Sequence, residues 1–384
     1  MNTTPDPTWG SDAGASLPVA VEVLRYGPLS RAEIGRRLGL SHASLSRLSA
    51  PLIERGVIID IGEHNNGRVG RPTRLLDVDA SKHHFLGMKI RETEIIAAVT
   101  NMRGDIVAHS HTPMEERTPE AVVARVRAIH AAASGERAIT GLGIGIGGAV
   151  HERRTVIRAG FLGWSDVPLA DLVESATGSQ TLVENDVVAL CEYEDWFGAA
   201  AEDDRFAVIT LGIGTGFGLV LNGQPIVNDD YGIGLVGHWP MDPTGPLCEQ
   251  GHRWCAAALL NSDAIARYAT EALGTPVSFD ETVQRAADGQ PGPVRIIEDA
   301  ARGLGILVAA VCNLVLPQRV IIAGEGVRLA EVGWDTLVQS IRDHRAPQSH
   351  LPPIELSSGD NLEWARGAAV LAIQAFALGR FTGP

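Results

Sequence analysis

The chain of 384 residues is longer than one ordinary domain, and this length predicts two or three domains. Hydrophobic residues make up 45% of the chain, enough for a large core, and no apolar run reaches the ~18 residues of a membrane span. Four cysteines in so long a chain argue against a disulfide-built fold and favour a reducing compartment, so we expect a cytoplasmic protein.

The net charge of −14 at pH 7 is unevenly distributed along the chain. Residues 15–76 contain nine arginines and five acidic residues, so this part carries +4 and the rest carries −18. A basic module on an acidic body favours contact with nucleic acid through that module alone, because the remaining surface repels phosphate. Residues 1–14 have neither the basic nor the apolar region of a signal peptide, and their composition predicts a disordered tail.

Residues 15–80 have the pattern of a winged helix-turn-helix domain. Three helices are expected, the first of them ending before a Gly-Pro break. Ser30, three residues before Glu33, is typical of a capping box that opens the second helix, and Gly39 is a candidate for its C-terminal end. Ser41 can cap the third helix. Two helices joined by a short turn that contains glycine indicate a helix-turn-helix.

In a helix-turn-helix, the N-terminal part of the second helix of the motif enters the major groove of DNA. The side chains that we predict to contact DNA there are small or polar, with one arginine: Ser41, His42, Ser44, Ser46 and Arg47. Two strands follow, and the loop between them carries Arg68 and Arg71, which could act as a wing on the DNA backbone or in a narrow minor groove. The alternative is a helical hairpin used for protein contacts, with an ordinary arginine-rich loop.

From residue 85 onward, short apolar segments alternate with turns and helices. The expected strands are 86–90, 94–99, 105–110, 140–147, 181–184, 206–211 and 216–221, and the expected helices include 119–133 and 186–197. Strands that precede helices, repeated in two halves, predict an α/β domain with two lobes over residues 81–384.

Two glycine-rich segments invite a chemical interpretation. The segment 143–148 matches a dinucleotide-binding fingerprint letter by letter, but a turn follows it where that motif needs a helix, so we expect no nicotinamide binding. The segment 212–216 lies between two strands. Its backbone N–H groups could face a phosphate or a hydroxyl, or it could be a hairpin turn whose glycines only supply positive φ.

Glu184, Asn185 and Asp186 stand at a junction from strand to helix. A carboxylate there could accept a proton from a sugar hydroxyl, and the plainer alternative is a helix N-cap.

His238, Cys248 and Cys255 cluster within eighteen residues and resemble a zinc loop that lacks one thiolate. Gln250 and His252 lie between the two cysteines. Gln250 is a poor zinc ligand, whereas His252 could turn in as the fourth ligand. The other two possibilities are a site completed by water and a loop that has lost its metal.

Taken in order, these motifs resemble the ROK family, which unites sugar-responsive repressors with sugar kinases. The segments that carry the resemblance are LSRAEIGRRLGLSHASLSRL, the GRP of the wing, LGWSDVPL at 162–169, END at 184–186, GIGTGFG at 212–218 and the GH…C…C loop. The resemblance implies an α/β fold: a winged helix-turn-helix followed by a two-lobed, actin-like ATPase domain of the sugar-kinase type. It also implies that Asn185, Asp186 and His238 bind the effector and that His238, Cys248 and Cys255 hold structural zinc.

The departures from the family bear on catalysis. Its kinases begin this domain with an Asp-x-Gly-Gly-Thr loop for metal and phosphate, and here the matching stretch, 89–93, is KIRET and keeps only the threonine. Its two sugar-binding glutamates fall on Leu235 and Ala257. We therefore expect no phosphotransfer and no requirement for ATP or Mg²⁺. The effector could be a sugar or sugar phosphate, a modified sugar, another metabolite, or absent.

These observations predict a DNA-binding transcriptional regulator, in the first instance a repressor, of carbohydrate-related genes. Helix-turn-helix modules read short half-sites, so we expect a homodimer or homotetramer on a pseudo-palindromic operator in double-stranded DNA, and no membrane partner. The alternatives are a sugar kinase with an appended DNA module and a scaffold that does not bind DNA.

Overall fold

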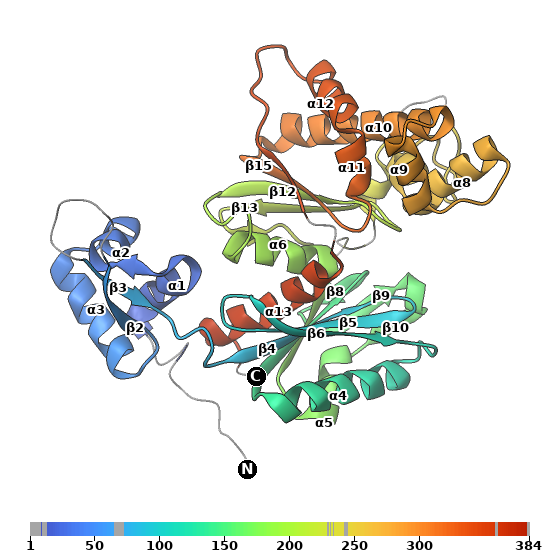
Figure 1. Cartoon of the computed structure of the whole chain (residues 1–384). Coiled ribbons are helices and arrows are strands. Elements are labelled where there is room, and N and C mark those ends of the chain that lie inside the picture. The colour runs from blue at the N-terminus through green and yellow to red at the C-terminus, as the bar shows by residue number, and fades with distance from the viewer. Residues whose placement is uncertain are drawn as a thin grey trace. The chain divides into compact units, whose positions relative to one another are not determined.

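The computed structural model describes Trp9 and residues 14–64, 73–228, 230, 232, 234–241, 245–357 and 360–381. The chain forms two compact units (Figure 1). The first contains Met1–Ile146, His151–Glu184 and Trp364–Pro384, and the second contains Gly147–Val150 and Asn185–Glu363. Among the described residues, no helix combines the length and the apolar character needed to cross a membrane.

The first unit begins with the expected helix-turn-helix. Its helices are α1 (Leu17–Tyr26), α2 (Arg31–Leu38) and α3 (His42–Glu54), after a short 3₁₀ turn, η2 (Gly14–Ser16). The strands of this module form an antiparallel sheet in the order β1-β3-β2. They are β1 (Leu29–Ser30), β2 (Ile59–His64) and β3 (Thr73–Asp77). Arg68 and Arg71, predicted to lie in the wing, fall outside the described residues.

The predicted caps of these helices are confirmed. The Ser30 hydroxyl accepts a hydrogen bond from the Glu33 backbone N–H at 3.1 Å, and the Ser41 hydroxyl accepts one from the Ser44 N–H at 3.2 Å. Gly39 ends α2 with a φ of 63°, a conformation that glycine adopts without steric cost. Strand β1 was not expected, because two residues carry no periodic pattern.

The larger sheet of the first unit has the order β11-β7-β4-β5-β6. Its strands are β4 (His84–Ile90), β5 (Glu94–Thr100), β6 (Ile106–Pro113), β7 (Ile139–Ile146) and β11 (Thr181–Asn185). Helices α4 (Pro119–Glu136) and α5 (Leu169–Thr177) cover one face and α13 (Leu362–Ala377) covers the other (Figure 1). A small sheet adds β10 (Trp164–Val167) and β9 (Thr155–Ala159), with η3 (Gly160–Leu162) between them and β8 (Ala149–His151) at its edge.

Two glycines of this sheet let α13 approach its strands closely. A Cβ atom at Gly143 would lie 2.6 Å from the carbonyl carbon of Ala368, and one at Gly87 would lie 2.8 Å from the Cβ of Ala369. The chain then continues into strand β8 instead of a helix. The fingerprint-like glycines of segment 143–148 therefore include one that the packing of α13 requires, and the helix that dinucleotide binding needs is missing there.

The second unit is built on a sheet of order β14-β13-β12-β15-β16. Its strands are β12 (Arg205–Thr210), β13 (Gly216–Leu221), β14 (Gln224–Pro225), β15 (Arg319–Ala323) and β16 (Ile354–Leu356). Strand β12 pairs antiparallel with β13 and parallel with β15, which pairs parallel with β16. The sheet is therefore mixed, and it forms the core of a lobe of the predicted α/β class.

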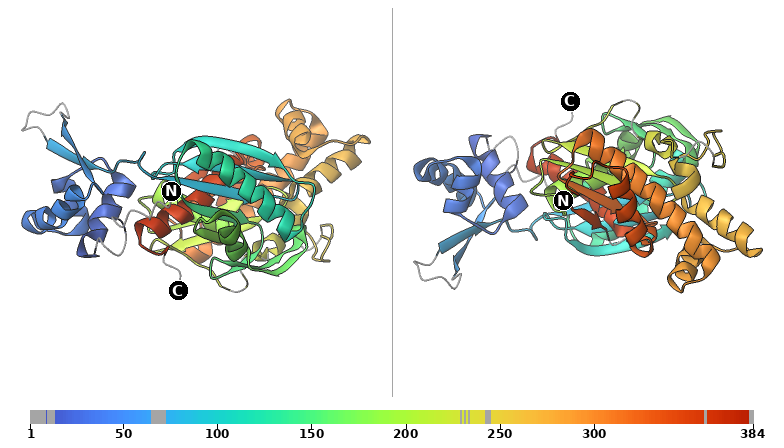
Figure 2. Two further views of the ribbon diagram at one scale, coloured as in Figure 1. Left: turned by 90° about the horizontal axis from the view of Figure 1, so that it is seen from below. Right: turned by 90° about the horizontal axis from the view of Figure 1, so that it is seen from above.

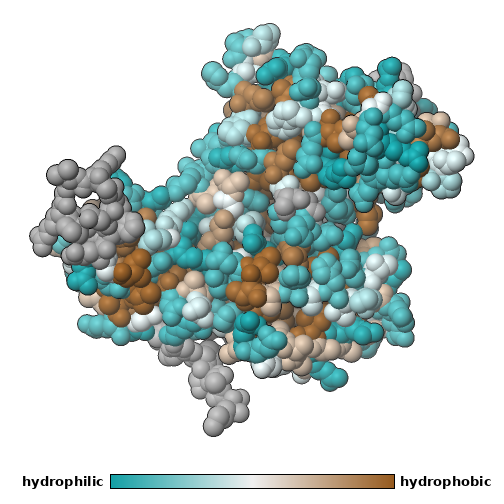
Figure 3. All heavy atoms as spheres, viewed as in Figure 1, coloured by the Kyte–Doolittle hydropathy of each residue, from teal (hydrophilic) through white to brown (hydrophobic). Residues whose placement is uncertain are grey.

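Helices cover both faces of this sheet. Helix α6 (Asp186–Trp196) lies on one face, and α10 (Pro291–Val315) and α12 (Trp334–Asp343) lie on the other (Figure 1, and the view from above in Figure 2). The remaining helices are α7 (Ala256–Leu260), α8 (Ser262–Leu273), α9 (Phe279–Ala287), α11 (Arg328–Val332) and the 3₁₀ turn η4 (Leu235–His238). Leu304, Ile322 and Leu337 are among the fully buried side chains of the core, whereas α8 and α9 present a mostly hydrophilic surface in Figure 3.

Candidate functional site

The side chains predicted to contact DNA lie on one face of α3 and its cap. Ser41, His42, Ser46 and Arg47 are exposed, and Ser44 is partly exposed. On the opposite face, Leu45 and Leu52 are each 1% exposed and anchor the helix in the module. The burial pattern therefore presents these polar groups to solvent together, as a major-groove helix requires.

Several arginines outside α3 in the described part of the module already pair with acidic groups within it. Arg31 and Arg74 approach the Asp60 carboxylate at 3.8 and 3.1 Å, and Arg37 approaches Glu22 at 3.4 Å. Within the described part of the chain, Arg47 forms no such ion pair. The α3 arginine is therefore the better placed of these groups to meet a phosphate or a guanine edge.

The stretch that replaces the kinase phosphate loop is filled by its own side chains. Lys89 is only 9% exposed, and its ammonium group lies 4.9 Å from the centre of the Trp364 ring. The Arg91 guanidinium lies 3.4 Å from the Glu94 carboxylate, and Glu92 pairs with Arg117 at 2.7 Å. The only acidic group in this stretch thus pairs with an arginine, and two cations stand where the kinases hold metal and phosphate.

The contacts at the Glu184–Asp186 junction support the interpretation of these residues as a helix N-cap. Asn185 caps α6, because its side-chain oxygen accepts the N–H groups of Val187 and Val188 at 2.9 and 3.3 Å. Its amide nitrogen donates to the Gly148 carbonyl at 2.9 Å. The Glu184 carboxylate lies 3.4 Å from the Arg153 guanidinium.

The glycine-rich turn between β12 and β13 is not a turn that needs positive φ. Gly212, Gly214 and Gly216 all have ordinary negative or extended φ values, so that interpretation is wrong. Two of them lie close to other side chains: a Cβ atom at Gly212 would lie 2.6 Å from the Glu325 carboxyl carbon, and one at Gly216 would meet the Thr210 side chain. A carboxylate therefore lies directly over the first glycine of this turn.

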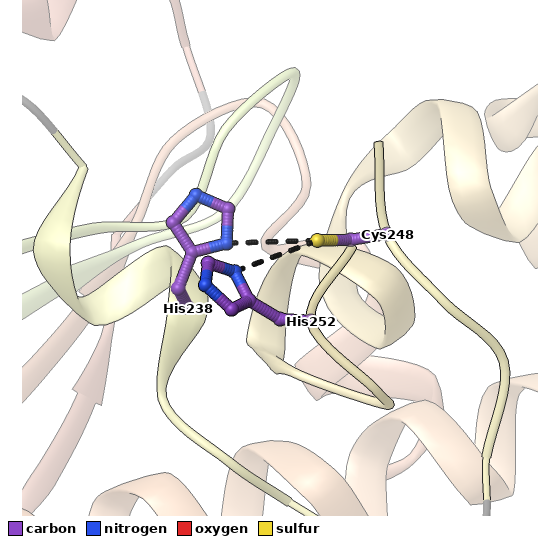
Figure 4. Close-up of side chains that lie close together, drawn as sticks. All are labelled: His238, Cys248 and His252. Atoms are coloured by element: carbon purple, nitrogen blue, oxygen red, sulfur yellow. Dashed lines mark hydrogen bonds between the residues drawn. The ribbon is translucent and has the colours of Figure 1, made fainter. Parts of the chain in front are cut away.

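Three side chains with metal-binding chemistry come together in the loop between η4 and α7 (Figure 4). The ligand atoms of His238, Cys248 and His252 lie within 4.8 Å of one another. The Cys248 sulfur is 3.8 Å from Nδ1 of each histidine, and the buried Cys255 sulfur is 3.7 Å from Nδ1 of His238. Tetrahedral zinc with bonds of about 2.0–2.3 Å holds such ligands roughly 3.5 Å apart, so the distances from the Cys248 sulfur to both histidines, and from the Cys255 sulfur to His238, are close to those of a zinc site.

The conformation of this loop brings His252 to the site and leaves Gln250 exposed. The Cys248 N–H donates to the His252 carbonyl at 2.8 Å, across a turn at Gly251, whose φ is 82°. The sequence alone identified His252 as one candidate for the fourth ligand, and the structure places it beside Cys248.

Electrostatics in the loop favour one thiolate and neutral imidazoles. Burial opposes ionisation of Cys248, but backbone hydrogen bonds from Gln250 and His252 outweigh it and lower the pKa of this thiol. Burial raises the pKa of Cys255. Burial and the nearby His252 lower the pKa of His238 and so favour the neutral ring that binds metals.

Comparison with known proteins places this arrangement in a family. The sequence profile of the ROK family matches residues 85–375. The chain is 28% identical to a protein of Caldicellulosiruptor sp. (strain Rt8B.4) described as a candidate xylose repressor, over 82% of this chain and 84% of that protein. The crystal structure of a ROK family transcriptional regulator, a homologue of the E. coli MLC protein, superposes with a TM-score of 0.81 at 24% identity, over 96% of this chain and 98% of that one.

Enzymes of the same fold are also similar. A ROK family glucokinase from Streptomyces griseus, solved with glucose and AMPPNP, superposes with a TM-score of 0.66 at 27% identity, over 75% of this chain and 98% of that one. Because the family profile spans most of the chain, from the first strand of the two-unit body to its last helix, the protein belongs to the ROK family.

Proposed function

We propose that this protein is a sequence-specific DNA-binding transcriptional regulator, a repressor of carbohydrate-related genes. Residues 15–80 act as its DNA-binding domain and residues 81–384 as its effector-sensing body. The observation that carries the proposal is the exposed polar face of α3, with Arg47 outside any ion pair of the described residues, in a chain whose net charge is −14. An acidic chain that keeps a basic module gains DNA contact at that module alone.

The extent of the structural likeness supports the regulator over the kinase. The ROK regulator covers 96% of the 384 residues, about 369, whereas residues 81–384 number only 304. Its likeness therefore extends into the N-terminal module. The glucokinase covers 75%, about 288 residues, which the body alone can supply.

The two loops that could meet a nucleotide support the loss of kinase activity. Lys89 and Arg91 stand in the first, and the Glu325 carboxylate lies over Gly212 in the second, where it would repel a phosphate. Phosphoryl transfer depends on positioning and charge neutralisation, so both changes act against it.

The effector site of this proposal uses Asp186 and His238, with Asn185 shaping the start of α6. Asn185 already uses both of its polar groups within the protein, so its contribution is to hold the α6 N-terminus in place. Leu235, on the same short helix as His238, is 61% exposed and offers a sugar hydroxyl no hydrogen bond. This favours a sugar-derived effector that is less polar than a free hexose.

The metal loop holds a structural zinc ion in this proposal, with His238, Cys248 and Cys255 as ligands and His252 completing the set. Zinc would join η4 to the start of α7, because His238 lies on the first and Cys255 directly precedes the second. The mutual distances of His238, Cys248 and His252, and the 3.7 Å from the Cys255 sulfur to Nδ1 of His238, support this ligand set.

DNA selection with the full chain tests the regulator function. Repeated selection from random duplexes should enrich a pseudo-palindromic sequence, and Arg47→Ala should weaken binding to it by about 1–3 kcal/mol, if Arg47 reads a guanine edge. Arg127→Ala is the matched control, because Arg127 is exposed on α4 of the body. Failure to enrich any sequence, or unchanged binding after removal of residues 1–80, would contradict the proposal.

A further inference from the structure

One side chain of the body holds the helix-turn-helix module by three contacts within the first unit. Arg103 lies in the turn between β5 and β6, and its Nη1 donates to the Gly27 carbonyl at 2.6 Å. Its Nη2 donates to the Val23 carbonyl at 3.1 Å and also pairs with the Asp77 carboxylate. Val23 and Gly27 end α1, and Asp77 ends β3, so a single guanidinium joins a helix and a strand of the module to the sheet of the body.

The turn that carries Arg103 is itself well fixed. The Asn101 side-chain oxygen accepts the N–H groups of Arg103 and Asp105 at 2.8 and 3.1 Å. Met102 is 1% exposed, and its N–H donates to the Ala80 carbonyl at 3.0 Å, in the connection that follows the module. The guanidinium is therefore presented from a rigid base and loses little freedom when it binds.

Gly27 leaves the space that this contact needs. A Cβ atom at Gly27 would lie 2.7 Å from Arg103 Nη2 and 2.8 Å from the Asp77 carboxylate oxygen. The carbonyls at a helix C-terminus carry partial negative charge, so a cation there is favourable. We call Arg103, with Val23, Gly27 and Asp77, the Arg103 clamp.

A second, independent contact holds the chain on both sides of the module. The ring of Phe376 on α13 lies 6.2 Å from that of Trp9, which precedes the module and is 6% exposed. The same ring lies 4.7 Å from His83 and 5.6 Å from Phe85, which follow the module. Phe376 of the body thus contacts the chain both before and after the module.

We propose that the Arg103 clamp fixes the orientation of the helix-turn-helix on the body and thereby sets the spacing of the two half-sites that an oligomer accepts. This inference rests on the proposed DNA binding by a symmetric oligomer. When each module is held rigidly, both recognition helices reach the major groove only at one separation. When the clamp is released, the connection after β3 lets each module find its half-site over a range of separations.

The test uses the full chain and the sequence that DNA selection enriches. Binding is measured on duplexes whose half-site spacer is changed by one to five base pairs, in the unaltered protein, Arg103→Ala and Arg127→Ala. On duplexes with a changed spacer, the unaltered protein and the Arg127→Ala control should engage only one half-site. Their affinity should then fall by about 100-fold, since bivalent binding contributes roughly 10²–10⁴-fold. In Arg103→Ala this loss should shrink to about tenfold or less, while affinity for a single half-site stays unchanged.

A measurement without DNA distinguishes release of the clamp from unfolding of the variant. Amide hydrogen exchange should quicken at Gly27, whose N–H bonds to the Val23 carbonyl, and in residues 78–83, but remain slow in strands β4 and β7. Asp77→Asn, which keeps the size of the side chain and removes its charge, should give an intermediate spacing dependence. If all variants bind with the same spacing dependence as the unaltered protein, the clamp role is overturned. If the unaltered protein enriches no DNA, the proposed function itself fails.

Discussion

Replacing Gly143 by alanine should destabilise the first unit strongly, because the new methyl group meets the backbone of α13. The added Cβ would lie 2.6 Å from the carbonyl carbon of Ala368, about 1 Å short of the 3.5–4.0 Å at which carbon atoms attract. The obstacle is helix backbone and cannot rotate away as a side chain can, so α13 or β7 must shift by about that distance. Such overpacking costs about 1–3 kcal/mol, and we expect the upper end of this range.

Gly135→Ala is the matched control for this substitution. Gly135 lies in the last turn of α4, has an ordinary φ, and a Cβ atom there meets nothing within 4 Å. It should leave the free energy of unfolding unchanged or raise it by up to about 1 kcal/mol, since alanine favours the helix over glycine. Urea unfolding followed by circular dichroism measures both variants. A Gly143→Ala protein with the unfolding midpoint of the unaltered chain would refute the close packing of α13 on β7.

Three further predictions concern catalysis, metal binding and pH. No hexose of a panel should be phosphorylated with ATP and Mg²⁺ in a coupled assay, and turnover of about 1 s⁻¹ would show a working kinase. Protein purified without chelator or histidine tag should contain near-stoichiometric zinc by elemental analysis. The zinc should be lost in a Cys248→Ala, Cys255→Ala double variant. The zinc content should fall in His252→Ala but stay unchanged in Gln250→Ala, and an equal fall in these two single variants would contradict the ligand set. Burial lowers the pKa of His130, so the fold favours its neutral ring. The contribution of His130 to the free energy of unfolding should therefore fall as the pH drops below 6.5, where the ring becomes protonated first in the unfolded chain. His130→Gln should reduce this slope between pH 7.5 and 5, and an unchanged slope would assign it to other groups.

The helix starts of the module could be predicted from the sequence because their signals are local. Ser30 and Ser41 accept hydrogen bonds from residues only three positions further along the chain. The two-residue strand β1 could not be predicted, since it exists only through its pairing with Leu75 and Leu76 of β3. Its formation is a property of the folded module and leaves no pattern in two residues.

The candidate site shows the same division between local and long-range signals. The residue types of the metal loop point to zinc chemistry, but which residue comes fourth depends on the turn at Gly251 that brings His252 back toward Cys248. Arg103 gives no signal at all, because Val23 and Gly27 precede it by 80 and 76 residues. Contacts of that range follow from the packing of the module on the body.

Lys89 shows how this fold could exchange catalysis for stability. Phosphoryl transfer needs metal and phosphate to be positioned and their charge neutralised. Here the Lys89 ammonium lies over the ring of Trp364, where α13 starts and the chain returns from the second unit to the first. A buried cation–π contact of this kind contributes to folding whether or not a ligand is bound. A regulator needs only that its effector bind two conformations with different affinity, and that requirement places no demand on the phosphate loop. In the proposed regulator, the stretch 89–93 can therefore take part in the packing between β4 and α13, the helix whose Phe376 contacts the chain on both sides of the helix-turn-helix module.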